Sequence, residues 1–243
     1  MPCPVVYQIL DEMDIPFLVR VRPIDEKSLG DRCEGSSPDK LVRMLANAKA
    51  DAFLHDLPEA QRNLLDDGEP KIISNDEQND SDDKESEKRQ PVLPSPVSPG
   101  GYIILAADQV VSHRNHILEK PRSLDEARSF VKGYADSPPS TVGAICLLHL
   151  PSRERVEGVH SATIHFSKGV AGGGVGDDLI SRLVAAGAPV QDCAGGLMVE
   201  HPLVREFIVG IDGTEDSVMG LSKKLVWDLL AELREKITKT KDF

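Results

Sequence analysis

The polar stretch over residues 66–101 constrains the fold of this 243-residue chain more than any other feature of its sequence. Residues 76–89 hold seven acidic and three basic side chains, and four prolines follow within residues 91–99. Such a charge density leaves too little apolar surface to bury, and closely spaced prolines favour an open, extended backbone. We therefore expect one folded domain assembled from residues 1–65 and 102–243, interrupted by a disordered, acidic and proline-rich insertion.

The overall charge argues against several kinds of partner. A formal net charge of -12 repels DNA, RNA and anionic membranes, and an aromatic content of 4% offers no stacking platform for bases. No stretch approaches the roughly 20 apolar residues of a membrane helix, and the first residues lack the basic start of a signal peptide. Four widely spaced cysteines without a CxxC pair indicate free thiols rather than a zinc site. We expect a cytoplasmic protein that binds neither nucleic acid nor membrane.

Apolar periodicity on both sides of the insertion alternates between helix and strand, which is the pattern of an α/β fold. Ser37 can cap a helix over residues 36–57, and Ser123 with Glu126 forms the capping box of another helix. Further helices are predicted at the N-terminus, over residues 175–187 and over residues 216–237. Strands are predicted over residues 17–23, 102–111, 141–150 and 156–168, the last two forming a hairpin.

Four charged side chains accompany these apolar elements. Glu26 and Asp108 come at the ends of predicted strands, Lys49 lies in an apolar helix, and Lys120 precedes a proline. In open α/β sheets ligands bind beyond the strand ends, where loops converge. Carboxylates there can hold a divalent cation and lysines can neutralise phosphate oxygens, so the set is compatible with a metal-assisted phosphoryl site. Each residue alone is more typical of a solvated surface charge, and the spacing does not establish that the four converge.

Six short motifs follow one another in a characteristic order: IDE (24–26), LANAKA (45–50), AADQVV (106–111), EKP (119–121), AGGLMVEHP (194–202) and GTEDSVMGLS (213–222). Together they resemble the Maf family of nucleotide pyrophosphatases, most closely its eukaryotic, plant-like branch. The resemblance implies an elongated, mixed α/β sheet in two lobes with a central cleft, related to the inosine triphosphatase fold. It also implies a homodimer that uses Mg or Mn to hydrolyse a pyrimidine nucleoside triphosphate (dTTP, UTP, CTP or a modified form) to the monophosphate and pyrophosphate.

The resemblance assigns roles to individual residues. Asp108 corresponds to the catalytic acid, which orients or deprotonates the attacking water, and Glu26 to a second acid that contacts metal or water. Lys49 and Lys120 correspond to the lysines that stabilise charge on the triphosphate, as phosphoryl transfer requires.

Two further positions are expected to bind substrate on the same grounds. Gln109 stands where many members of the family carry Thr. Glu200 falls where bacterial members often carry Gln, which places it near the base or the attacking water.

The chain departs from the family at its N-terminus, where Maf proteins carry a strand and a phosphate-binding SxSxxRR loop. Residues 4–7, PVVY, stand in place of that loop, so the first strand and both arginines are missing. Either the start codon was assigned too late or the chain is a true short isoform. Three functions therefore remain open: an active pyrophosphatase, a catalytically impaired Maf-like protein that binds nucleotides or a partner, and a regulatory role carried by residues 66–101.

Overall fold

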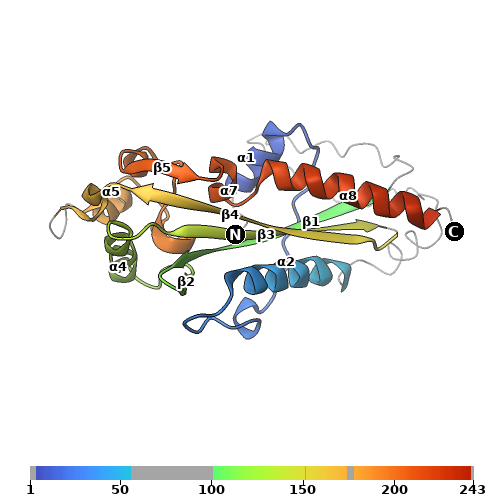
Figure 1. The fold of residues 1–243 in the computed structure, drawn as a ribbon, viewed down its shortest axis with the longest axis horizontal. Helices are drawn as coiled ribbons and strands as arrows, with labels where there is room; N and C mark the ends of the chain where they lie inside the picture. Colours follow the sequence, from blue (N-terminus) through green and yellow to red (C-terminus); the bar gives the residue numbers. More distant parts are fainter. Residues whose placement is uncertain (1–3, 56–100, 151, 174–177, 242–243) are drawn as a thin grey trace, which may run out of the picture.

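A long, five-stranded sheet forms the centre of the molecule (Figure 1). The computed structural model describes residues 4–55, 101–150, 152–173 and 178–241, so the predicted insertion lies almost entirely outside the described residues. The strand order of the sheet is β2-β1-β3-β4-β5, and every neighbouring pair of strands is antiparallel. The α/β class and the elongated sheet are thereby confirmed. The strands are β1 (Tyr102–His113), β2 (His116–Leu118), β3 (Ser140–Leu150), β4 (Arg155–Phe166) and β5 (Ile208–Asp212).

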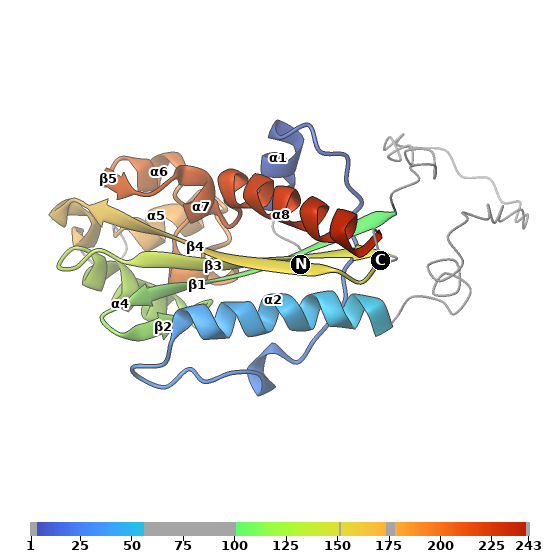
Figure 2. The same ribbon diagram turned by 45° about the vertical axis from the view of Figure 1, so that its right-hand side comes forward.

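Helices cover both faces of this sheet. Figure 2 shows α2 (Pro38–His55) beneath it, with α1 (Pro4–Glu12) and α8 (Lys223–Lys241) above it. Successive residues of a strand point to opposite faces of the sheet. Ala106 and Val110 of β1 therefore pack on the α2 side, whereas Leu105 packs against the hydrophobic core on the α8 side. The sheet is therefore buried from two sides by apolar stripes that recur with helical spacing.

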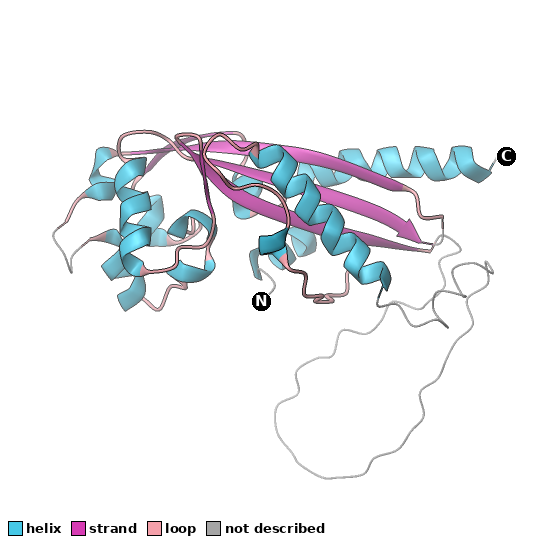
Figure 3. Cartoon of the chain, turned by 90° about the horizontal axis from the view of Figure 1, so that it is seen from below, coloured by secondary structure: helices cyan, strands magenta, loops and turns pink. Residues whose placement is uncertain are grey.

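A second group of helices packs at one end of the sheet (Figure 3). It contains α4 (Leu124–Tyr134), α5 (Leu179–Ala185) and α6 (Pro202–Arg205), with the short 3-10 turns η2 (Lys168–Ala171), η3 (Val190–Asp192) and η4 (Ala194–Gly196). Ser123 caps α4 as predicted, accepting a bond from the amide of Glu126 at 3.1 Å. The Glu126 carboxylate accepts from the Arg122 amide at 2.6 Å, one residue earlier than in a standard capping box.

The prediction of one helix over residues 216–237 was wrong. The chain forms α7 (Glu215–Met219) and then α8, because Gly220 adopts a φ of +117° that ends the first helix. The Asp216 carboxylate accepts from the amide of Lys223 at 2.6 Å, and the Ser222 hydroxyl accepts from the amide of Leu225 at 3.3 Å. These side chains accept hydrogen bonds from amides in the first turn of α8 and so stabilise the start of that helix.

The strand predicted over residues 17–23 was also wrong. Residues 15–25 form no strand or helix, and the side chains of Leu18, Val19 and Val21 are 43%, 42% and 57% exposed. A strand needs a hydrogen-bonding neighbour, and β1 pairs only with β3 along residues 102–110 in the described part of the chain. Residues 13–25 instead carry the chain from the α8 side of the sheet to the α2 side (Figure 2).

Among the described residues, no helix combines the length and the apolar character that crossing a lipid bilayer requires.

Candidate active site

Asp108 lies within β1 rather than at its end, opposite Ala144 of β3. Its position in the strand places it on the same face as Ala106 and Val110, the face that α2 covers. The side chain is only 10% exposed. A carboxylate at such a position must find a partner in the covering helix or in the loop beside it.

Lys49 of α2 is that partner. It follows the buried residues Leu41 and Leu45 at intervals of four, so the three side chains share the helix face that meets the sheet. The Lys49 ammonium lies 2.5 Å from Oδ1 of Asp108 and 3.0 Å from Oε1 of Glu26. A single ammonium thus bridges two carboxylates that are far apart in the sequence.

Glu26 reaches this position from the first residue of the 3-10 turn η1 (Glu26–Ser28). Asp25 caps the turn, accepting a bond at its carboxylate from the Ser28 amide at 3.3 Å and at its carbonyl from the Ser28 hydroxyl at 2.9 Å. The Glu26 side chain is 48% exposed, so the carboxylate lies at the edge of the site, between the buried Asp108 and solvent.

Arg32 holds this turn in place, and the sequence analysis did not identify it. Its guanidinium donates to the carbonyls of Glu26 and Leu29 at 2.7 and 2.6 Å, and to the Glu119 carboxylate at 2.9 Å. The Glu119 carbonyl in turn accepts from the amide of Gly195 in η4 at 3.1 Å. Arg32 therefore connects the segment carrying Glu26 to the segment carrying Glu119 and Lys120.

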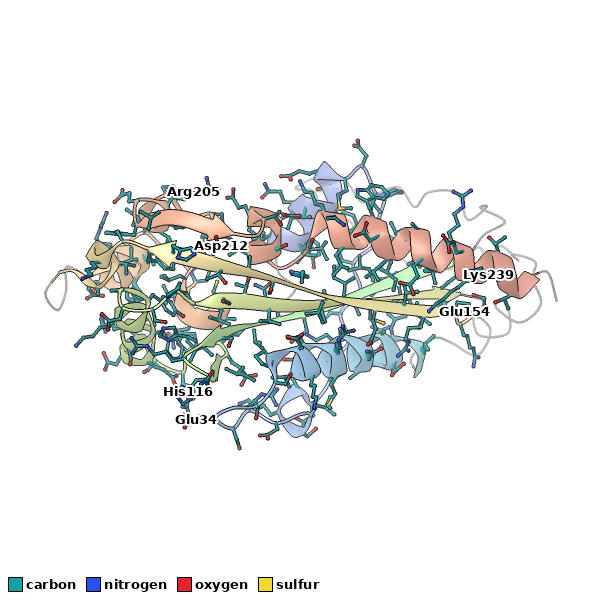
Figure 4. The ribbon with its side chains drawn as sticks, in the orientation of Figure 1. Glu34, His116, Glu154, Arg205, Asp212 and Lys239 are labelled. Atoms are coloured by element: carbon teal, nitrogen blue, oxygen red, sulfur yellow. The ribbon has the colours of Figure 1, made fainter. Side chains whose placement is uncertain are left out.

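The loop between η1 and α2 has a second anchor at the β1–β2 hairpin. The amide of Gly35 donates to the carbonyl of Asn115 at 3.0 Å. Glu34 and His116 meet on the surface beside this bond, with 3.8 Å between the carboxylate and the ring nitrogen (Figure 4). Both side chains are more than half exposed, so the backbone bond is the firmer contact.

The charges of the site shift the pKa values of its two most buried members. Burial raises the pKa of Asp108 above its usual value, and the negative charges of Glu26 and Glu119 raise it further, although Lys49 opposes this. Burial acts to lower the pKa of Lys49, but Asp108 and Glu26 outweigh it, so that this pKa lies above its usual value. The lysine stays charged at neutral pH, and Asp108 becomes a stronger base than an exposed aspartate.

The remaining predicted residues make no hydrogen bond or ion pair with the trio of Glu26, Lys49 and Asp108 in the described part of the chain. Lys120 is exposed and directly follows Glu119, and Glu200 is half-buried in the turn between η4 and α6. Gln109 points to the sheet face opposite Asp108, where its amide donates to the Val218 carbonyl at 2.8 Å.

The fold and the cluster of two carboxylates and one ammonium are the features that comparison with known proteins assigns to a family. Residues 6–233 match the Maf-like protein family, so the chain belongs to the Maf family. It is 27% identical to the 7-methyl-GTP pyrophosphatase of Dictyostelium discoideum, over 94% of this chain and 92% of that protein. It is 25% identical to the dTTP/UTP pyrophosphatase of Salinibacter ruber, over 91% of this chain and 83% of that protein.

A third relative is matched over a shorter region. The nucleoside triphosphate pyrophosphatase of Salinispora tropica is 30% identical over 136 residues, which are 56% of this chain and 57% of that protein.

Proposed function

We propose that this chain is a nucleoside triphosphate pyrophosphatase that releases a nucleoside monophosphate and pyrophosphate. The observation that carries the proposal is the Lys49 ammonium bridging the Asp108 and Glu26 carboxylates in a member of the Maf family. The names of its relatives support the reaction class, since each is a pyrophosphatase of a nucleoside triphosphate.

Asp108 serves in this proposal as the general base. Its raised pKa suits it to accept a proton from a water that attacks the α-phosphorus, while the bond from that phosphorus to the bridging oxygen breaks. Glu26, more exposed, lies where it can help to orient the same water. Lys49 and Lys120 neutralise the phosphate oxygens on which negative charge accumulates.

The residues present also fit a divalent cation. Carboxylate oxygens are the ligands that Mg²⁺ and Mn²⁺ prefer, and one or two of them commonly hold Mg²⁺ together with substrate phosphates. The described residues contain no group of three or more acidic, His or Cys side chains placed to enclose an ion. Glu26 and Asp108 would therefore be its protein ligands, and a bound ion would supply positive charge beside the triphosphate.

The preferred base is a separate part of the proposal. The family resemblance favours a pyrimidine, as in dTTP, UTP or CTP, whereas a relative matched over 94% of this chain is named for 7-methyl-GTP. Gln109 and Glu200 stay candidates for substrate binding. A panel that contains these four nucleotides separates the two specificities directly.

The test is pyrophosphate release from that panel with Mg²⁺ or Mn²⁺. Asp108→Asn should lower kcat by roughly 100-fold or more, since a positioned general base contributes about that much. The matched control is Asp125→Asn on α4, whose side chain is 93% exposed and should leave the rate unchanged. A wild-type rate in Asp108→Asn, with both variants folded, would remove Asp108 from the mechanism.

A catalytically impaired nucleotide-binding protein is the second candidate. It is favoured by the sequence at residues 4–7, which lie in α1 and hold no arginine for a phosphate. Nucleotide binding by calorimetry and pyrophosphate release are measured on the chain as it is and on a chain extended with an SxSxxRR segment. Binding without pyrophosphate release favours the impaired protein, and release favours the active enzyme. Sedimentation of the same samples tests the proposed homodimer.

A further inference from the structure

The position of the Lys49 ammonium raises a question about the order of events at this site. It lies between the Asp108 and Glu26 carboxylates, 2.5 Å from one and 3.0 Å from the other. A divalent cation shared by the same two carboxylates would need the same space, since its oxygen ligands lie roughly 2 Å away. The ammonium and the ion are therefore alternative occupants of one position.

The backbone segments that carry the two carboxylates are held by contacts that do not involve Lys49. Asp108 belongs to a strand paired with β3, opposite Ala144, and the backbone of Glu26 is fixed by Arg32 at 2.7 Å. Lys49, in contrast, reaches the site on a flexible four-carbon stem and is 28% exposed. The positions of both backbones are thus set without Lys49, so the ammonium can leave without releasing either segment.

The charges around the pair favour the exchange. Asp108 feels the negative charge of Glu119 as well as that of Glu26, but Glu119 is already paired with Arg32 at 2.9 Å. Lys49 leaves one unit of negative charge on the Glu26–Asp108 pair uncompensated, and a divalent ion compensates both carboxylates. The ammonium that it expels then carries a positive charge that is free to pair with another anion.

We infer that Lys49 is a displaceable counter-ion, which occupies the Glu26–Asp108 pair until a divalent cation expels it and frees its ammonium for phosphate oxygens. This rests on the proposed function for the identity of the anionic ligand, although the exchange itself needs no nucleotide. In this scheme, metal binding is the event that makes the Lys49 ammonium available to the phosphate oxygens.

The experiment measures Mn²⁺ binding without nucleotide, by electron paramagnetic resonance or calorimetry at pH 8. Lys49→Met should bind Mn²⁺ roughly tenfold more tightly than wild type, because the competing charge is gone. Lys49→Arg should bind no more tightly than wild type. Lys40→Met, at an exposed position of the same helix, is the matched control and should change nothing. Adding Glu26→Gln to Lys49→Met should abolish the gain.

A second readout follows Lys49 in the unmodified protein. Acetylation by an amine-reactive ester, quantified by mass spectrometry, should become faster at Lys49 when Mn²⁺ is added, with Lys40 as the internal reference.

Unchanged or weaker Mn²⁺ binding by folded Lys49→Met, or no Mn²⁺ binding by any variant, would overturn the inference. Because no turnover is measured, the result is independent of the proposed reaction. Tighter Mn²⁺ binding by Lys49→Met in a protein that releases no pyrophosphate would uphold the exchange and refute the proposed function. Pyrophosphate release by the wild type without tighter Mn²⁺ binding by Lys49→Met would uphold the function and refute the exchange.

Discussion

Arg32→Met tests whether one guanidinium holds the active-site segments together. The substitution keeps the aliphatic stem but removes three hydrogen bonds, to the carbonyls of Glu26 and Leu29 and to the Glu119 carboxylate. Bonds to charged groups contribute roughly 1.5–3 kcal/mol each, but the freed carbonyls can hydrate and the Glu119 side chain is 45% exposed. We therefore expect the free energy of unfolding to fall by about 2 kcal/mol, well below the sum of three bonds.

The assay is urea unfolding followed by circular dichroism, with pyrophosphate release measured on the same samples. Arg43→Met is the matched control, because its guanidinium meets the Glu157 carboxylate at 2.9 Å on the surface, and it should cost less than about 0.5 kcal/mol. If the proposed function holds, Arg32→Met should also lower kcat, since Glu26 loses its support. Equal destabilisation by the two substitutions would show that Arg32 does not connect the two segments.

Two further predictions concern the scaffold around the site. Burial lowers the pKa of His113, so the unfolded chain binds a proton at this residue more readily than the folded chain does. The free energy of unfolding should therefore fall as the pH drops below about 6.5. His113→Gln should flatten this loss in urea titrations between pH 7 and 5, and the exposed His116→Gln should not; equal slopes would contradict the assignment. Gly220→Ala should cost about 1–2 kcal/mol through the backbone alone, because φ is +117° there while an added Cβ would meet Val6 and Gln109 only at ordinary contact distances of 3.8 and 3.9 Å. A neutral Gly220→Ala would show that the α7–α8 break does not depend on that backbone conformation.

Short-range pattern was enough to place several elements. Ser123 was identified as a helix cap from the residues beside it, and its hydroxyl accepts the expected amide. The interval of four between Leu41, Leu45 and Lys49 fixed one helix face, so Lys49 had to point toward whatever Leu41 and Leu45 bury. These inferences succeeded because helix geometry and capping depend on neighbours within one or two turns.

The same local reasoning failed where a distant partner decided the outcome. Residues 17–23 carry a strand-like pattern, but a strand exists only where a neighbour supplies hydrogen bonds, and the described chain supplies none there. The leucine repeat over residues 216–237 suggested one helix, whereas the left-handed backbone at Gly220 divides it in two.

The sequence by itself determined which charged residues were available, and the order of its motifs indicated the family. Only the tertiary structure brought Glu26 and Asp108 within 3.0 Å of the Lys49 ammonium and joined Arg32 to Glu119, 87 positions away. The physical reason is that charge pairing depends on distance in space, which the packing of α2 on β1 sets. The spacing of these residues along the chain does not predict that packing.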